Sequence, residues 1–203
     1  MFNPRREDLA NVASRRLENW GLPGLASRAV SEIDVIGPLL PAVARDAIFA
    51  WAHGGPKPPV SRAGAPRMPV FVTLRKLDGA LRGCIGALHA VEADVIAETE
   101  RSAVLAASRD PRFAPVRGDE ISELRIEVSV LFAPEPVSGL GDLDPHRYGL
   151  IVRGEGCQAL LLPEVPGIDD PRMQLAVTKK KAGLAVDAPA TLSRFEVRKF
   201  SEL

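Results

Sequence analysis

Cysteine and aromatic residues are scarce in this 203-residue sequence, and their scarcity excludes several kinds of protein. The two cysteines, Cys84 and Cys157, lie far apart, so the chain is not a small secreted scaffold held together by disulfides. Aromatic residues make up 5% of the chain, which is too few for a surface on which nucleic-acid bases would stack. The spacing of the cysteines and histidines matches no zinc-binding pattern, so we expect no metal site.

Net charge and long apolar runs are also absent. Lys and Arg total 26 and Asp and Glu total 26, which gives a net charge of +0. A neutral chain exerts little long-range attraction on nucleic acid or anionic lipid, so we expect neither as a partner. No apolar run reaches the roughly 20 residues that span a bilayer, and residues 1–8 lack the apolar stretch of a signal peptide. We therefore expect a cytoplasmic protein.

The remaining composition is that of a globular domain, with 46% hydrophobic and 26% charged residues. Some segments repeat apolar residues at helical spacing, and others are β-branched or alternate between apolar and polar residues. The expected helices cover residues 3–20, 25–33, 39–52, 94–108 and 170–183, and the expected strands cover residues 70–76, 81–88, 124–132, 149–153, 157–162 and 191–200.

These elements predict an α/β fold of the α+β type, with a mixed, largely antiparallel sheet and flanking helices. Asp78-Gly79 favours a type I′ hairpin turn, because both central positions of that turn need a positive φ. Hairpins favour antiparallel pairing, which excludes a doubly wound parallel nucleotide-binding fold. Alternation along the strand at 124–132 predicts which side chains face the core: Leu124, Ile126, Val128, Val130 and Phe132.

The strongest chemical signal is Arg-Gly-Cys-Ile-Gly at residues 82–86, on the return strand of the first hairpin. Strands rarely contain two glycines, since each one forfeits side-chain packing. Gly83 and Gly86 would let a ligand, or another stretch of backbone, approach the Cys84 thiol closely. Arg82 shares a face with Cys84 in a regular strand, where its charge would favour the reactive thiolate. Cys84 and Arg82 are therefore the candidate catalytic residues.

The same motif has a structural alternative. Free cysteines are among the most buried residues and often pack as small hydrophobic groups. The glycines equally suit a bulge beneath the helix expected at 94–108. His89 falls on the opposite face of a regular strand, although a bulge at Gly86 would reverse that, and spacing does not link His53 or His146 to Cys84. Both roles of the motif remain open at the level of sequence.

Two further residues are candidates for ligand binding. Arg112 belongs to the segment Arg109-Asp110-Pro111-Arg112-Phe113, where Asp-Pro ends the preceding helix. Two arginines beside a helix end could hold a carboxylate or a phosphate, although a simple helix stop explains the segment as well. Glu127 lies on the polar face of the strand at 124–132.

Several segments of the sequence resemble the AMMECR-one domain family, also called AmmeMemoRadiSam system protein A. Leu-Arg-Gly-Cys-Ile-Gly at residues 81–86 is similar to the family signature, and Phe-Val-Thr-Leu at 71–74 precedes it, as in the family. Further motifs follow in the family's order at residues 110–116, 127–131, 134–136, 160–165 and 181–184. The chain departs from the pattern at 166–180, where a Trp-containing helix start is missing and Lys179 replaces a common cysteine.

The resemblance implies an α/β domain of two unequal lobes, with Cys84 near the cleft between them. Family members have no established biochemical activity, but in many microbes they are associated with Memo-like and radical SAM proteins, which are the expected partners. The resemblance implies an enzyme or enzyme component that uses Cys84, or else a non-catalytic accessory module; it names no cofactor. Residues 1–37 lie outside the match and are expected to form an N-terminal helical extension to a domain at 38–203. Leu17 and Trp20 of this extension are expected to dock on the domain or on a second subunit.

Overall fold

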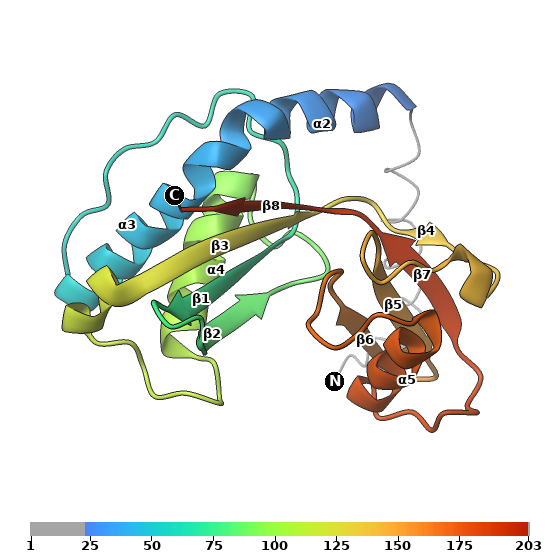
Figure 1. Cartoon of the computed structure of the whole chain (residues 1–203). Coiled ribbons are helices and arrows are strands. Elements are labelled where there is room, and N and C mark those ends of the chain that lie inside the picture. The colour runs from blue at the N-terminus through green and yellow to red at the C-terminus, as the bar shows by residue number, and fades with distance from the viewer. Residues whose placement is uncertain (1–22, 203) are drawn as a thin grey trace, which may run out of the picture.

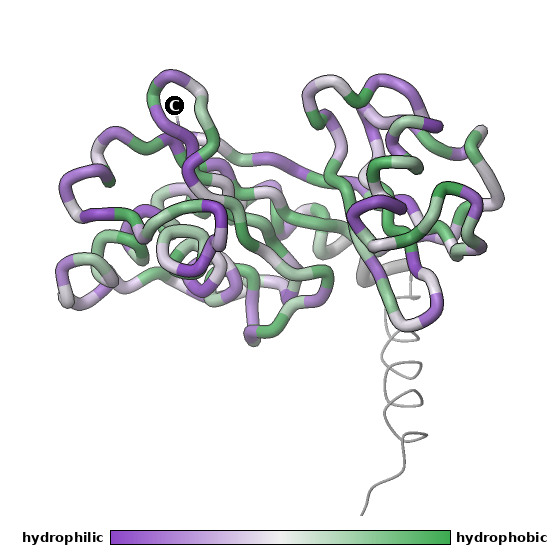
Figure 2. Tube along the Cα trace, turned by 90° about the horizontal axis from the view of Figure 1, so that it is seen from below, coloured by the Kyte–Doolittle hydropathy of each residue, from purple (hydrophilic) through white to green (hydrophobic). Residues whose placement is uncertain are grey.

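The protein has two unequal bodies, which form the two ends of an elongated molecule (Figures 1 and 2). The computed structural model describes residues 23–202. The helix expected over residues 3–20, with Leu17 and Trp20, lies outside the described residues. None of the described helices is long and apolar enough to cross a bilayer.

The larger body is built on an antiparallel four-stranded sheet in the order β2-β1-β3-β8. Helix α4 packs on β1 and β2, and α3 packs on α4 and β3, so the helices cover one face of the sheet. The elements of this body are α2 (Pro23–Ile36), η2 (Gly37–Leu39), α3 (Leu40–His53), β1 (Val70–Lys76), β2 (Leu81–Gly86), α4 (Val95–Ser108), η3 (Gly118–Glu123), β3 (Leu124–Leu131) and β8 (Val197–Ser201).

The smaller body contains a second four-stranded sheet, in the order β4-β7-β5-β6, with helix α5 packed on β5 and β6. Every strand pair in both sheets is antiparallel. This confirms the predicted α+β class and its antiparallel character. The elements are β4 (Glu135–Pro136), η4 (Leu140–Asp142), β5 (Gly149–Gly154), β6 (Cys157–Leu161), α5 (Pro171–Lys181) and β7 (Thr191–Phe195).

The single strand expected at 191–200 is two strands that belong to different sheets. The chain leaves the smaller body at the exposed Glu196 and enters the larger body as β8. Phe195 is buried in an apolar cluster where residues of both bodies meet, such as Ile151 of β5 and Leu131 of β3, whereas Phe200 packs on the main core of the larger body. The sequence pattern of residues 191–200 shows no interruption between the two strands. Only the tertiary structure shows that β7 and β8 belong to different sheets.

The first hairpin also differs from its prediction in detail. Strand β2 ends at Gly86 rather than at residue 88. Gly79 has a φ of 87°, but Asp78 does not have a positive φ, so the turn is not type I′. The Gly79 N–H donates to the Lys76 carbonyl at 2.9 Å. A single left-handed glycine at the end of a slightly longer turn is therefore sufficient to close this hairpin.

The predicted inner face of β3 is confirmed. Leu124, Ile126, Val128 and Val130 are buried in the main core between the sheet and its helices. Phe132 lies just beyond the strand and is partly buried against the same core. The alternate side chains of β3 consequently point to the other face of the sheet.

Helix α2 packs on the larger body, although it lies before the family-like segment. It is longer than the helix expected at 25–33, and its Ile33 is fully buried in the main core. At Gly37 an added Cβ would lie 2.1 Å from the Phe200 ring, so only glycine permits this approach to β8. The division into an extension at 1–37 and a domain at 38–203 stays a prediction, and residue 33 contributes to the core of that domain.

Candidate functional site

The sheet of the larger body has one face covered by α3 and α4 and another, which we call the open face, that points away from them. Side chains alternate between the two faces of a strand, so the neighbours of the buried core residues lie on the open face. Strand register places Cys84, Thr73, Glu127 and Ser201 in one row across β2, β1, β3 and β8. The row on one side contains Arg75 and Arg125, and the row on the other contains Gly86, Phe71, Ser129 and Lys199.

The smaller body covers one end of the open face. Phe71 packs in an apolar cluster with Ile151 and Leu160 of the smaller sheet. Lys199 reaches across to Glu164, with a distance of 2.6 Å between the ammonium nitrogen and the carboxylate oxygen. Between these contacts, the Ser129 hydroxyl is buried and has no hydrogen-bond partner. The polar row with Cys84 therefore lies next to the covered end, toward the free end of the face.

The Cys84 thiol is half-buried and contacts Thr73 on the neighbouring strand. The Cys84 Sγ and the Thr73 Oγ1 are 3.3 Å apart, and either atom can be the donor. Thr73 is itself buried, with 7% of its surface exposed. When Cys84 is a thiolate, the hydroxyl has to donate, so the arrangement provides the reactive form with a hydrogen bond.

A buried carboxylate fixes the backbone at Cys84. β2 is an edge strand, and its free Cys84 N–H donates to Asp110 Oδ2 at 2.9 Å. Arg112 holds the same carboxylate with two side-chain bonds of 2.9 Å and 2.7 Å. The Arg112 guanidinium is the main cause that holds the pKa of Asp110 far below its usual range, so the group stays ionised. The segment after α4 thus caps the edge of the signature strand.

Arg112 is the arginine whose charge is coupled to Cys84. The Asp110 carboxylate is the largest influence that raises the pKa of Arg112; burial opposes it, and Cys84 makes a smaller contribution in the same direction as Asp110. The Arg112 side chain is about half exposed and lies over the Phe113 ring at 5.4 Å. The backbone of Cys84 therefore lies beside an ion pair, whose more exposed member is Arg112.

Arg82 has a different environment from the one expected. The register of β1 and β2 shifts at this point, so that Arg75 pairs with Leu81 and Arg82 is the extra residue of a bulge. The buried Arg82 guanidinium donates to Glu120 at 3.1 Å and 3.3 Å, and to the carbonyl oxygens of Ala114 and Pro115. A regular strand would have aligned it with Cys84, whereas the bulge directs it to the segment at 114–120.

The two glycines of the motif are explained by packing. A Cβ on Gly83 would lie 2.4 Å from the Ala106 carbonyl oxygen, so α4 could not approach β2 as closely. A Cβ on Gly86 would lie 2.3 Å from the Val70 carbonyl oxygen. Protein atoms, rather than open space, therefore occupy the room that these glycines leave.

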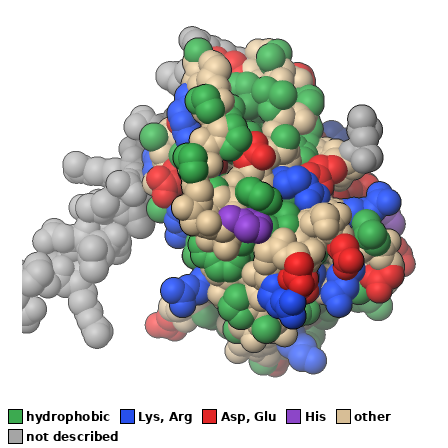
Figure 3. Space-filling view, turned by 90° about the vertical axis from the view of Figure 1, so that its left-hand side faces the viewer, with side chains coloured by type: hydrophobic (Ala, Val, Ile, Leu, Met, Phe, Trp, Pro, Cys, Tyr) green, Lys and Arg blue, Asp and Glu red, His purple; other side chains and the backbone are tan. Residues whose placement is uncertain are grey.

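None of the three histidines, which all lie in the described part of the chain, forms a hydrogen bond with Cys84. His53 is at the end of α3, where it stacks on Phe49 with ring centroids 4.1 Å apart. Figure 3 shows that end of the molecule, where histidine, hydrophobic and charged side chains are interspersed on the surface. His146 is in the smaller body, 3.7 Å from Asp169, and His89 follows β2. Burial lowers the pKa of His89, and the charge of Arg153 adds to the effect.

Two acidic residues near the motif, Glu127 and Glu98, lie in different environments. Glu127 lies opposite Thr73 in the polar row, and its Oε2 is 3.4 Å from the Ser201 hydroxyl. Glu98 is fully buried and accepts the backbone N–H groups of Val91 and Glu92. Glu127 is the carboxylate that shares a face with Cys84, whereas Glu98 fixes the loop after β2. Among the described residues, no group of three His, Cys, Asp or Glu side chains is arranged to hold a metal ion.

A cavity of about 320 Å³ lies where the two bodies meet, and Cys84 does not line it. Its walls come from α2, from the chain around Glu196 and from loops of the smaller body, and include Phe132, Glu164 and Arg198. The signature cysteine was expected near an interlobe cleft. The cysteine lies on the open face with Thr73 and Glu127, next to the end that the smaller body covers, and its place relative to a cleft stays a prediction.

Comparison with known proteins identifies the family. The AMMECR1 model matches residues 41–200. The chain belongs to the AMMECR1 family. A Thermotoga maritima protein is 41% identical over 140 residues, which are 68% of this chain and 78% of that protein. This confirms the resemblance that the motifs of the sequence indicated.

Two further similar proteins are a longer relative, of which this chain matches only a part, and a relative of known structure. A Clostridium acetobutylicum protein is 37% identical over 133 residues, which are 66% of this chain but only 28% of that longer protein. The crystal structure of an uncharacterised Pyrococcus horikoshii protein has a TM-score of 0.74 and 34% identity, and covers 82% of this chain and 91% of that one. The fold of the present AMMECR1 protein is thus shared with a solved structure.

Proposed function

We propose that this AMMECR1 protein is an enzyme, or a component of one, in which Cys84 is the nucleophile or covalent acceptor. The observation that supports this most directly is the contact between Cys84 Sγ and the buried Thr73 hydroxyl, on a backbone fixed by Asp110. Arg112, the more exposed member of the ion pair with Asp110, supplies a cation near Cys84, and Glu127 is available to accept a hydrogen bond from the substrate. Arg82, Gly83 and Gly86 act through packing, by holding the neighbouring segments against β2.

The reaction begins when the thiol loses its proton to solvent. The thiolate sulfur then donates an electron pair to an electrophilic carbon of the substrate, and a sulfur–carbon bond forms. The leaving group departs with the electrons of the bond that breaks. The Thr73 hydroxyl donates to the sulfur before this step and is free to leave it afterwards.

The proposal includes Memo-like and radical SAM proteins as partners in the same pathway. The long Clostridium relative supports a role as a component, because the matched domain is 28% of a larger chain there. Mixing the purified protein with a Memo-like protein, and separately with a radical SAM protein, tests this with sedimentation velocity. We expect a complex that sediments faster than either free protein with at least one of them. If each mixture shows only the boundaries of the two free proteins at all concentrations, the partnership is contradicted.

Alkylation rates test the thiol itself. The native protein is treated with iodoacetamide, and modification of each cysteine is followed by mass spectrometry. Cys157 is an internal control, because it is also half-buried and lies in a strand. We expect Cys84 to react faster than Cys157, and Arg112→Gln to slow Cys84 without changing Cys157.

A second candidate, the non-catalytic accessory module, is favoured by the glycines. Gly83 and Gly86 each face backbone atoms at less than 2.5 Å from a built Cβ, as a motif that serves packing requires. In that case Cys84 is inert in the native protein and reacts only after denaturation. A native Cys84 that remains unmodified while Cys157 reacts would contradict the catalytic proposal and favour this alternative.

A further inference from the structure

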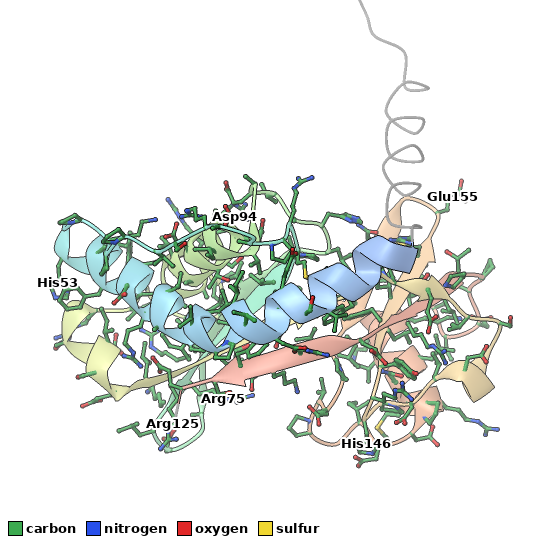
Figure 4. The ribbon with its side chains drawn as sticks, turned by 90° about the horizontal axis from the view of Figure 1, so that it is seen from above. His53, Arg75, Asp94, Arg125, His146 and Glu155 are labelled. Carbon is green, nitrogen blue, oxygen red and sulfur yellow. The ribbon has the colours of Figure 1, made fainter. Side chains whose placement is uncertain are left out.

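Two arginines lie directly opposite one another on the open face. Arg75 of β1 and Arg125 of β3 are cross-strand partners. Both are exposed, and Figure 4 shows them side by side, on the side of the molecule opposite to Asp94 at the start of α4. Like charges at directly paired positions of a sheet repel each other and destabilise it. The Arg75–Arg125 pair therefore destabilises the sheet. Its presence is better explained by a function than by a contribution to folding.

Carboxylates do not compensate this repulsion in the described structure. Arg75 donates to the Gly79 carbonyl at 3.1 Å, which uses one of its five N–H groups, and neither arginine has an acidic side chain within 4 Å. Many other described arginines do have such a partner: Arg45, Arg62, Arg82, Arg112, Arg117, Arg147, Arg194 and Arg198. The two guanidinium groups on the open face thus keep most of their donors free.

The position of the pair relates it to Cys84. Arg75 is two residues from Thr73 on the same strand face, and two residues of a strand span roughly 7 Å. Thr73 is the cross-strand partner of Cys84 on one side and of Glu127 on the other. A small molecule with its anionic end at the arginines therefore extends along the face until another part of it lies at the thiol.

We propose that Arg75 and Arg125 bind the carboxylate or phosphate group of a small-molecule substrate and direct its electrophilic carbon to Cys84. Guanidinium groups present paired donors that match the planar oxygens of a carboxylate and those of a phosphate. Glu127, in the row of Cys84 next to the arginines, accepts a hydrogen bond from a hydroxyl or amino group of the same molecule. The direction toward Cys84 rests on the proposed function, whereas the anion site itself does not.

The first experiment compares two alkylating reagents that differ in charge. Iodoacetate is an anion and iodoacetamide is neutral, and their rate ratio at Cys84 measures attraction by nearby cations. Replacing both arginines, Arg75→Gln with Arg125→Gln, should lower that ratio by at least about threefold, and 1 M salt should do the same to the native protein. Arg172→Gln is the matched control, since Arg172 is an exposed arginine on α5 in the smaller body. An unchanged ratio in the double variant would overturn the proposed direction toward Cys84.

The second experiment detects the anion site without the thiol. The Cys84→Ser protein is titrated with inorganic phosphate and, separately, with succinate, while ¹H–¹⁵N spectra report the backbone and the arginine Nε groups. We expect saturable shifts around residues 75 and 125 with at least one probe, and their loss in the double arginine variant. The probe that saturates at lower concentration decides between phosphate and carboxylate.

The outcomes separate the two proposals. Saturable binding of a probe, together with an inert native Cys84, would retain the anion site and overturn the catalytic thiol. A reactive Cys84, with no saturable shift for either probe, would retain the thiol and overturn the anion site. Saturable binding of an acidic polypeptide or an oligonucleotide, but of neither small anion, would overturn the assignment to a small molecule.

Discussion

At the scale of single residues, the site combines groups from distant parts of the sequence around one thiol. Thr73 precedes Cys84 by 11 residues and contacts its sulfur, and Asp110 follows it by 26 residues and fixes its backbone. Arg82 is the nearest arginine in sequence but is bonded to the segment at 114–120, whereas Arg112 holds the Asp110 carboxylate that accepts the Cys84 N–H. Chemical roles in this site therefore follow the strand register and not the spacing along the chain.

Replacing Thr73 tests its hydrogen bond to the thiol. Thr73→Val keeps the branched shape but removes the hydroxyl, so a thiolate at Cys84 loses a donor. A hydrogen bond of about 1 kcal/mol corresponds to roughly a fivefold slower reaction with iodoacetamide at neutral pH. Thr73→Ser retains the hydroxyl and should react nearly as fast as the native protein. Equal rates in the valine and serine variants would show that the hydroxyl has no influence on the sulfur.

The depressed pKa of Asp110 makes the stability of the protein dependent on acid. A carboxyl group whose pKa is lowered by folding stabilises the protein above its unfolded value of about 3.9, and this contribution is lost as the pH falls toward the folded value. Asp110→Asn should cost about 1–3 kcal/mol at pH 7, because Arg112 and the Cys84 N–H lose a charged acceptor. The deficit should shrink as the pH is lowered below about 4. Urea unfolding at several pH values measures both effects.

Asp119 provides the control for that experiment. It also pairs with an arginine, Arg117, but both side chains are mostly exposed, with 65% of Asp119 accessible. Exposed ion pairs contribute little, so Asp119→Asn should change stability by less than about 1 kcal/mol. A loss at pH 7 as large as that of Asp110→Asn would show that burial of the carboxylate is not what matters.

At the scale of elements, the close approach of α4 to β2 depends on the signature glycines. Gly83→Ala places a Cβ 2.4 Å from the Ala106 carbonyl oxygen, which belongs to helix backbone and cannot rotate away. The helix has to move, and overpacking of this kind costs about 1–3 kcal/mol. Gly139→Ala is the control, since a Cβ there meets no atom within 4 Å. Thermal melting compares the two, and equal melting temperatures would contradict the packing role of Gly83.

The elements that sequence predicts well are those whose signals are local. Signals of this kind are the β-branched and aromatic run of β1, the glycine turn before β2 and the helical spacing of apolar residues in α4. The change of sheet at Glu196 is not a local signal, because the strands on both sides of it have the same mixture of apolar and polar residues. The bulge at Arg82 is equally invisible, since it depends on the register with β1. The candidate cysteine could therefore be found from the sequence, but its neighbours Thr73 and Asp110 could not.

At the scale of the whole molecule, the two bodies are connected to each other, and helix α2, which precedes the family match, packs on the larger one. β7 and β8 join the two sheets by a continuous segment, and Lys199 pairs with Glu164 across the bodies. Helix α2 adds Ile33 to the main core and pairs its Asp34 with Arg198 of β8. The boundary of the family match is therefore not the boundary of the packed core, and this difference can be measured.

A chain that begins at residue 38 should fold but with reduced stability. It lacks Ile33, which is fully buried and contributes about 1.5–3 kcal/mol when it leaves water. For a chain of this size, each kcal/mol corresponds to roughly 2–4 °C in melting temperature. Ile33→Ala in the full chain should produce a similar loss without shortening the protein, because it removes the same side chain from the core. Differential scanning calorimetry of the full chain, the 38–203 chain and the Ile33→Ala variant decides the matter. A 38–203 chain that melts at the temperature of the full protein would show that α2 is dispensable, and one with no cooperative transition would show that the domain begins before residue 38.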